Sequence, residues 1–211
     1  MTPPAIPARY LDRLAGLCRS GARRIVGLVG APGAGKSTLA SALQQALGDD
    51  VCQVVPMDGY HLANNELARL GLSDRKGAPQ TFDVHGYLAL LRRLRDQRAD
   101  ELVYAPAFRR EIEEPIAGAI PVFPQTRLVI TEGNYLLVDD GPWKQIASLL
   151  DEVWYVDVEP ALRTRRLLSR HESFGRSAQA AIDWVGSVDE PNARLIEATR
   201  GRAQVVFRWD A

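Results

Sequence analysis

The sequence has 211 residues, with 26 basic and 26 acidic side chains and no formal net charge. This length suits a single domain, 1–211, with a sizeable core. The balanced charge argues against electrostatic capture of nucleic acid or a membrane surface, and it allows either a monomer or a homodimer. Cys18 and Cys52 match neither a disulfide framework nor a metal-ligand spacing, and no apolar run approaches a signal peptide or membrane span. We therefore expect a cytoplasmic protein.

The first third of the chain contains a strand–loop–helix pattern. Apolar residues at helical spacing predict a helix over about 7–20, and the apolar run Ile25–Val29 is typical of a buried parallel strand. An Ala/Leu/Gln-rich segment from Thr38 to Leu47 predicts the next helix. Between strand and helix lies the phosphate-loop pattern of Gly, four residues and Gly-Lys-Ser, formed by Gly30, Ala31, Pro32, Gly33, Ala34, Gly35, Lys36 and Ser37.

This pattern suits a nucleoside triphosphate. Glycines let successive backbone N–H groups turn inward as an anion-binding nest, and the positive end of the following helix points to the same place. Lys36 can reach the β- and γ-phosphates, and the hydroxyl of Ser37 can ligate Mg²⁺. The alternative is a glycine-rich turn with no ligand, but the complete pattern in this context favours binding of ATP with Mg²⁺.

The remaining chain alternates between apolar runs and amphipathic segments. A long polar stretch, 62–83, reads as a functional loop with a short helix near Glu66. Prolines interrupt the region 103–124, which we interpret as an irregular hairpin-like insert. We expect strands at 51–57, 127–131, 152–158 and 203–208. We expect helices at 84–98, 143–150 and 161–170, a loop at 171–177, a further helix that ends at 184, and a last helix at 191–199.

These alternating elements predict an α/β fold with three layers and a mostly parallel, doubly wound sheet. Ligands of such sheets bind beyond the carboxyl ends of the strands. Asp58 and Glu132 each directly follow a predicted strand, so both are candidates to serve Mg²⁺ or an acceptor hydroxyl. Helix capping or simple solvation is the alternative for each.

Several segments resemble a known family. The phosphate loop, Asp58-Gly59-Tyr60-His61 and Glu132-Gly133-Asn134 resemble the phosphoribulokinase/uridine kinase superfamily of P-loop kinases. The segment from Arg75 to Asp83 is similar to one in bacterial pantothenate kinases, as are stretches beginning at Asn192 and Thr199. Overall, residues 20 to 208 look most like bacterial proteins labelled nucleoside-kinase-like or fructose transport system kinases.

The resemblance implies roles for individual residues. Asp58 matches the residue that acts as base towards the acceptor, and Glu132 matches the one that holds Mg²⁺ with Ser37; we expect Asp58 to contribute to the metal site as well. It also implies an arginine-rich lid over the phosphates, about 163–177, within which we favour Arg166 and Arg170 as catalytic. We also expect Thr38, next to the phosphate loop, to contact the nucleotide. The resemblance further implies nucleotide contacts from Arg176 in the lid and from Thr199 and Arg200 beside the adenine.

The acceptor side is inferred less directly. Its candidate residues are Tyr60, His61, Lys76, Asp83, Tyr104, Phe108, Arg110 and Asn134. His61 can equally be an ordinary histidine, and Asp83 can equally cap the helix starting at Val84. Many relatives carry an acidic residue where this chain has Arg109, which leaves their substrates in doubt here. His85 and His171 are given no site role.

We therefore expect an ATP-dependent kinase that phosphorylates a hydroxyl of a small molecule. A sugar such as fructose is favoured by the nearest group, with pantothenate or a nucleoside as alternatives. A different class of function would be a P-loop ATPase or nucleotide switch acting on a protein partner. A regulatory subunit without catalysis is a third possibility, although the retained Lys36, Ser37, Asp58 and Glu132 argue against it.

Overall fold

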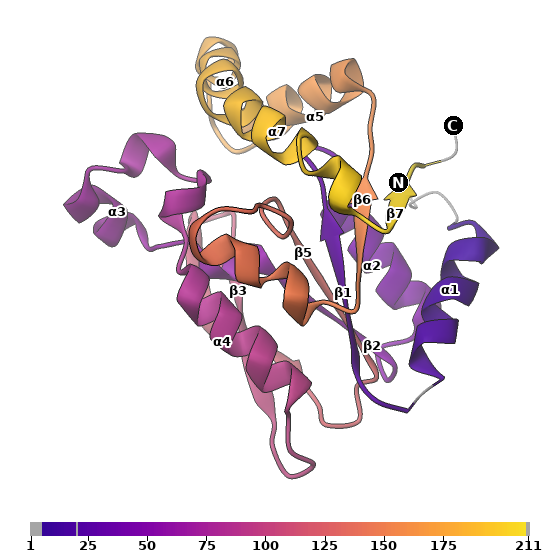
Figure 1. Cartoon of the computed structure of the whole chain (residues 1–211). Helices are drawn as coiled ribbons and strands as arrows, with labels where there is room; N and C mark the ends of the chain where they lie inside the picture. Colours follow the sequence, from indigo (N-terminus) through magenta and orange to yellow (C-terminus); the bar gives the residue numbers. More distant parts are fainter. Residues whose placement is uncertain (1–5, 20, 210–211) are drawn as a thin grey trace.

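The computed structural model describes residues 6–19 and 21–209 (Figure 1). Its centre is a five-stranded sheet in the order β2-β5-β1-β6-β7, and every neighbouring pair is parallel. The predicted α/β architecture with a parallel, doubly wound sheet is confirmed. The strands are β1 (Arg24–Val29), β2 (Cys52–Pro56), β5 (Leu128–Gly133), β6 (Glu152–Val156) and β7 (Val205–Phe207).

Apolar residues on both faces of the sheet produce three layers. Along β1, Ile25 and Val29 belong to one buried cluster, whereas Val26 and Leu28 belong to the other, because successive side chains of a strand point to opposite faces. Helices α1 (Ala8–Cys18) and α2 (Lys36–Leu47) pack on the second cluster, and α4 (Val84–Arg95) packs on the first (Figure 1).

The remaining elements stand above the carboxyl edge of the sheet or beside it. The insert is an antiparallel hairpin, as predicted, and its register shifts at Pro106, which has no N–H for the ladder. A π-helical turn, Val185–Asp189, joins α6 to α7. These elements are α3 (Asn64–Leu70), β3 (Val103–Arg109), β4 (Glu114–Val122), α5 (Pro160–Ser173), α6 (Ala178–Trp184) and α7 (Glu190–Glu197).

Three sequence-based boundaries were wrong. The segment predicted as a helix over 143–150 forms two 3-10 turns, Gly141–Gln145 and Ala147–Leu149, because Trp143 and Ile146 enter the core at the three-residue spacing of that geometry. Helix α5 continues past residue 170, so the predicted loop at 171–177 is shorter. Helix α4 ends before residue 98, just after its last buried leucine. No helix within the described ranges is both long and apolar enough to cross a membrane.

Candidate active site

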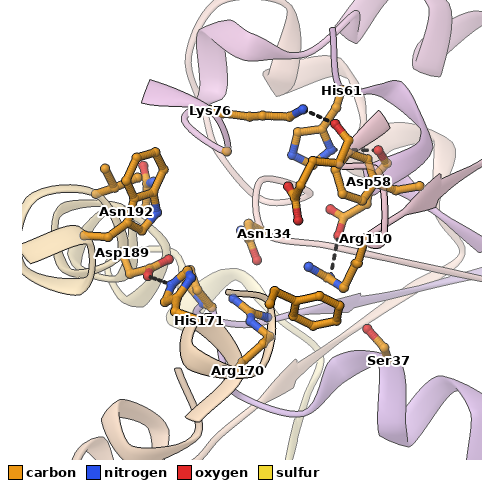
Figure 2. A pocket seen from close by; sticks show the side chains of 18 of the residues that line it. Ser37, Asp58, His61, Lys76, Arg110, Asn134, Arg170, His171, Asp189 and Asn192 are labelled. Atoms are coloured by element: carbon orange, nitrogen blue, oxygen red, sulfur yellow. Dashed lines mark hydrogen bonds and ion pairs between the residues drawn. The ribbon is translucent and has the colours of Figure 1, made fainter. Parts of the chain in front are cut away.

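A cavity of about 740 Å³ opens at the carboxyl edge of the sheet. The phosphate loop forms its floor, and side chains from the hairpin, the 62–83 segment and helix α5 form its walls (Figure 2). Sixteen of the predicted site residues line it: Pro32, Gly33, Gly35, Lys36, Ser37, Thr38, Asp58, His61, Lys76, Phe108, Arg110, Glu132, Asn134, Arg166, Arg170 and Arg176. Gly30, Ala31 and Ala34 belong to the same loop but are not among the lining residues.

The loop can adopt its path only with glycine at specific positions. Gly33 and Gly35 have φ angles of 80° and 92°, in the left-handed region that favours glycine. A Cβ at Gly33 would also lie 2.9 Å from Cγ of Leu167, so α5 packs directly against the loop. Lys36 is buried, and its Nζ donates to the carbonyl oxygens of Gly30 at 2.9 Å and Ala31 at 3.2 Å. Burial lowers the pKa of this ammonium group.

Two oxygen-bearing side chains lie where a phosphate-bound Mg²⁺ is needed. The hydroxyl of Ser37 donates to Oε1 of Glu132 at 2.9 Å, at the end of β5. The described residues include no group of three His, Cys, Asp or Glu that could hold a metal by themselves. Mg²⁺ commonly takes only one or two protein ligands and completes its shell with phosphate and water, so the pair fits this ion.

Asp58 lies beside this pair because its strand is paired with that of Glu132. Pro56 and Glu132 are register partners across β2 and β5, and the chain turns at Gly59 immediately afterwards. A Cβ at Gly59 would come 2.4 Å from the carbonyl oxygen of Pro106, so the turn packs tightly on the hairpin. Burial, and next the charge of Asp58, raise the pKa of Glu132.

Arginines from the hairpin and α5 converge on Asp58. Nη2 of Arg110 lies 3.4 Å from Oδ2 of Asp58. Arg170 projects from α5 into the same cavity (Figure 2), and its guanidinium makes no hydrogen bond or ion pair with any residue described. Burial, and then the neighbouring Arg110, lower the pKa of Arg170. Its five donors are therefore available to an anionic ligand.

The other predicted lid arginines have three different positions. Nη1 of Arg166 lies 3.5 Å from the position a Cβ would take at Gly35, which places it over the phosphate loop. Arg176 stacks on the ring of Trp184, with its guanidinium carbon 3.8 Å from the ring centroid. Arg163 is buried and pairs with Glu190 at 2.6 Å, so its contact is within the protein.

His61 and Lys76 form the opposite wall with Phe108. The His61 ring lies between Phe82 and Phe108, with centroids 4.0 and 4.6 Å away. Its Nδ1 is 2.7 Å from the carbonyl oxygen of Asp58, which can only accept, so Nδ1 carries the proton. Burial lowers the pKa of His61 and favours the neutral ring, whose Nε2 is then an acceptor.

Sequence reasoning missed part of this wall. Lys76 donates to Oδ1 of Asn64 and to the carbonyl oxygen of Glu113, where the backbone has a φ of 52°. His171, for which we expected no site role, lines the cavity and donates from Nε2 to Asp189 at 2.8 Å. The sequence signals for the missed residues came from whole segments: the stretch from Arg75 to Asp83, the stretch beginning at Asn192, and the predicted lid at 163–177. The missed lining residues are Asn64, Ser73, Gly77, Phe82, Glu113, His171, Phe174, Gly175, Trp184, Val188, Asp189 and Asn192.

Some predicted contact residues are not among the residues that line the cavity, and neither is Arg109; they are Tyr60, Tyr104, Thr199 and Arg200. Tyr60 packs its ring against Tyr87, whereas Tyr104 is 52% exposed on the hairpin. The hydroxyl of Thr199 donates to the carbonyl oxygen of Ile196 at 2.7 Å. The remaining one, Arg200, pairs with Asp157 at 2.9 Å.

Asp83 also lies outside this lining and instead caps α4. Its Oδ1 accepts from the backbone N–H of Gly86 at 2.8 Å, which satisfies one free donor of the first turn. We expect Asp83→Ala to lower the free energy of unfolding by about 1 kcal/mol, and Asp83→Ser to restore most of it, in urea denaturation. The KM for the acceptor should stay unchanged in both variants. A higher KM in both would instead assign Asp83 to the acceptor site.

Comparisons with known proteins agree with this geometry. Residues 25–209 match the phosphoribulokinase/uridine kinase family. A Schizosaccharomyces pombe protein named "Putative uridine kinase C227.14" is 33% identical over 93% of this chain and 88% of its own length. The "Pantothenate kinase" of Leifsonia xyli is 31% identical over 89% of this chain and 66% of its own.

A solved structure gives the same result. It is the "putative fructose transport system kinase" of Silicibacter sp. TM1040, which superposes with a TM-score of 0.86 at 39% identity. The superposition covers 95% of this chain and 98% of the other. A match to the family over most of the sequence, with the phosphate loop and the strand-end carboxylates gathered at one cavity, leads to one conclusion. The chain belongs to the phosphoribulokinase/uridine kinase family of P-loop kinases.

Proposed function

We propose that this protein transfers the γ-phosphoryl group of ATP to a hydroxyl of a small metabolite. The observation that carries the proposal is the convergence of three groups on one cavity: the phosphate loop with Lys36, the Ser37–Glu132 pair, and Asp58. Phosphoryl transfer needs a phosphate cradle, a site for Mg²⁺ and a group that positions the attacking hydroxyl. Each of these needs has a matching group here.

Asp58 is the proposed base. Its carboxylate would accept a hydrogen bond from the acceptor hydroxyl and then the proton as the oxygen attacks phosphorus. Arg110, 3.4 Å away, orients the carboxylate from the hairpin side. Lys36, the loop N–H groups and Arg170 would stabilise the charge that develops on the transferring group. Bound between Ser37 and Glu132, Mg²⁺ would neutralise charge on the β- and γ-phosphates.

The lid would exclude water from this reaction. Phe174, Gly175 and Arg176 line the cavity at the junction of α5 and α6, and Gly175 has a left-handed φ of 93°. Closure of this junction over the phosphates would favour transfer to the acceptor over hydrolysis. Arg166, four residues before Arg170 on the same helix face, would bind phosphate oxygens beside it.

A sugar is the proposed acceptor type. Amide side chains can both donate to and accept from hydroxyl groups, and those of Asn134 and Asn192 line the cavity, whereas the amide of Asn64 is engaged with Lys76 and Glu113. The relative named a fructose transport system kinase points the same way. The relatives named as uridine and pantothenate kinases keep a nucleoside and pantothenate as the alternative acceptors.

The direct test is release of ADP from Mg-ATP in the presence of fructose, pantothenate, uridine and related hydroxyl compounds. We expect one acceptor class to raise the rate by about tenfold or more over the rate without acceptor, because a closed site suppresses hydrolysis. Equal release with and without every acceptor would favour an ATPase or nucleotide switch. Bound ATP without turnover would contradict a kinase for all acceptors in the panel and favour a regulatory role.

A further inference from the structure

The strand order determines on which side of the phosphate loop the nucleoside part of ATP must lie. Asp58 follows β2 at one end of the sheet, the phosphate loop follows the central β1, and Trp209 follows β7 at the opposite end. The transferred γ-phosphoryl must face Asp58, where the acceptor binds. The nucleoside at the other end of the triphosphate therefore extends away from Asp58, towards the β7 side of the loop.

Trp209 lies next to the phosphate loop on that side. Its indole Nε1 is 3.7 Å from the position a Cβ would take at Gly35, and Nη1 of Arg166 is 3.5 Å from the same point. Both side chains therefore lie over the last glycine of the loop. Arg166 lines the cavity together with Thr38, which follows Ser37 on the first turn of α2.

Neighbouring side chains of the protein hold the indole ring of Trp209 in place. Its ring meets Phe207 edge-on with centroids 5.1 Å apart, and Phe207 in turn stacks on the buried Trp154. The preceding residue, Arg208, donates from Nε to Asp157 at 2.7 Å. A half-buried aromatic ring fixed in this way is a suitable surface for a nucleobase, because stacking loses little side-chain entropy there.

We propose that Trp209 is the residue on which the base of the nucleotide packs, with Arg166 binding the adjoining phosphates. This rests on the proposed function in taking ATP as the phosphoryl donor. It differs from our sequence-based expectation that Thr199 and Arg200 border the adenine; in the structure Thr199 donates to Ile196 and Arg200 pairs with Asp157. Stacking on an aromatic ring tolerates every base, so Trp209 would contribute affinity for nucleotides without selecting among them.

The test compares two ligands in calorimetric titrations without acceptor: Mg-ATP, and Mg²⁺ with inorganic tripolyphosphate, which has no base. We expect Trp209→Ala to weaken ATP binding by roughly tenfold to a hundredfold, while tripolyphosphate affinity stays within twofold. Trp209→Phe should keep most of the ATP affinity. Arg166→Ala should weaken both ligands, and Arg165→Ala, an exposed neighbour on α5, should weaken neither.

Two results would overturn the assignment: unchanged ATP affinity in Trp209→Ala, or an equal loss for ATP and tripolyphosphate, which would show a distorted phosphate loop. Retained tripolyphosphate binding demonstrates that the variant still folds around its loop. The proposed function fails separately. A wild-type protein that binds Mg-ATP but phosphorylates no acceptor would refute the kinase reaction, while the comparison of the two ligands would still decide the role of Trp209.

Discussion

Asp58→Asn is expected to lower acceptor-stimulated ADP release by about 100- to 10,000-fold, the usual contribution of a general base. The amide has nearly the same shape as the carboxylate but cannot take the acceptor proton. The substitution leaves the phosphate loop and the Ser37–Glu132 pair in place, so Mg-ATP should still bind to the variant. Steady-state assays with the best acceptor, alongside calorimetric titration with Mg-ATP, measure the two effects separately.

Asp74→Asn is the matched control for this change. Asp74 is an exposed aspartate of the 62–83 segment and does not line the cavity, so its variant should keep full activity. Full activity in Asp58→Asn would contradict the role of Asp58 as base. Equal loss of transfer and of Mg-ATP binding would instead assign Asp58 to the nucleotide site.

Glu132→Gln is expected to have opposite effects on activity and stability. The amide is a poor ligand for Mg²⁺, so Mg²⁺-dependent transfer should fall by about 100-fold or more. Burial and the nearby Asp58 raise the pKa of Glu132 above its ordinary value of 4.5, which means that the ionised carboxylate destabilises the folded state. The neutral amide should therefore raise the free energy of unfolding at pH 7 by about 0.5 to 2 kcal/mol.

The sign of this stability effect can be checked by varying pH. The folded state binds the proton of Glu132 more tightly than the unfolded state, so wild-type stability falls as pH rises through the raised pKa. The advantage of Glu132→Gln should be complete above that pKa and vanish as pH falls below 4.5.

Glu152→Gln provides the contrasting control in urea denaturation. Glu152 is equally buried but accepts from Nε of Arg13 at 2.6 Å, so removing its charge should lower stability. Destabilisation by Glu132→Gln at pH 7 would contradict the electrostatic argument.

The sequence was sufficient to predict the part of the site that is formed by residues close together in the chain. Residues 25–47 encode strand, loop and helix in one continuous segment, so the phosphate loop follows from neighbouring residues alone. The meeting of Asp58 with Glu132 needed only one further rule, because carboxyl ends of parallel strands lie at the same edge of a sheet. Even the hairpin was visible in the prolines that interrupt it.

The rest depends on contacts between distant segments, which no local pattern records. His171 meets Asp189 only because a π-helical turn brings the second residue to face α5. Trp209 reaches the loop only because β7 is placed beside β6 rather than at the other edge. Asp83 illustrates a second reason, which is that a local pattern can fit two roles. One residue type suited both a helix cap and a substrate contact, and the hydrogen bond to Gly86 identifies the cap.

Helix α5 contacts the phosphate loop and also lines the cavity above it. At the middle of α5, Leu167 occupies the space beside Gly33 that a Cβ would need, and about one turn later Arg170 and His171 line the cavity. We therefore expect a shift of the loop on binding ATP to move the cavity-lining residues of the same helix. Linkage makes this coupling reciprocal: whatever factor ATP adds to the affinity for the acceptor, the acceptor adds to the affinity for ATP.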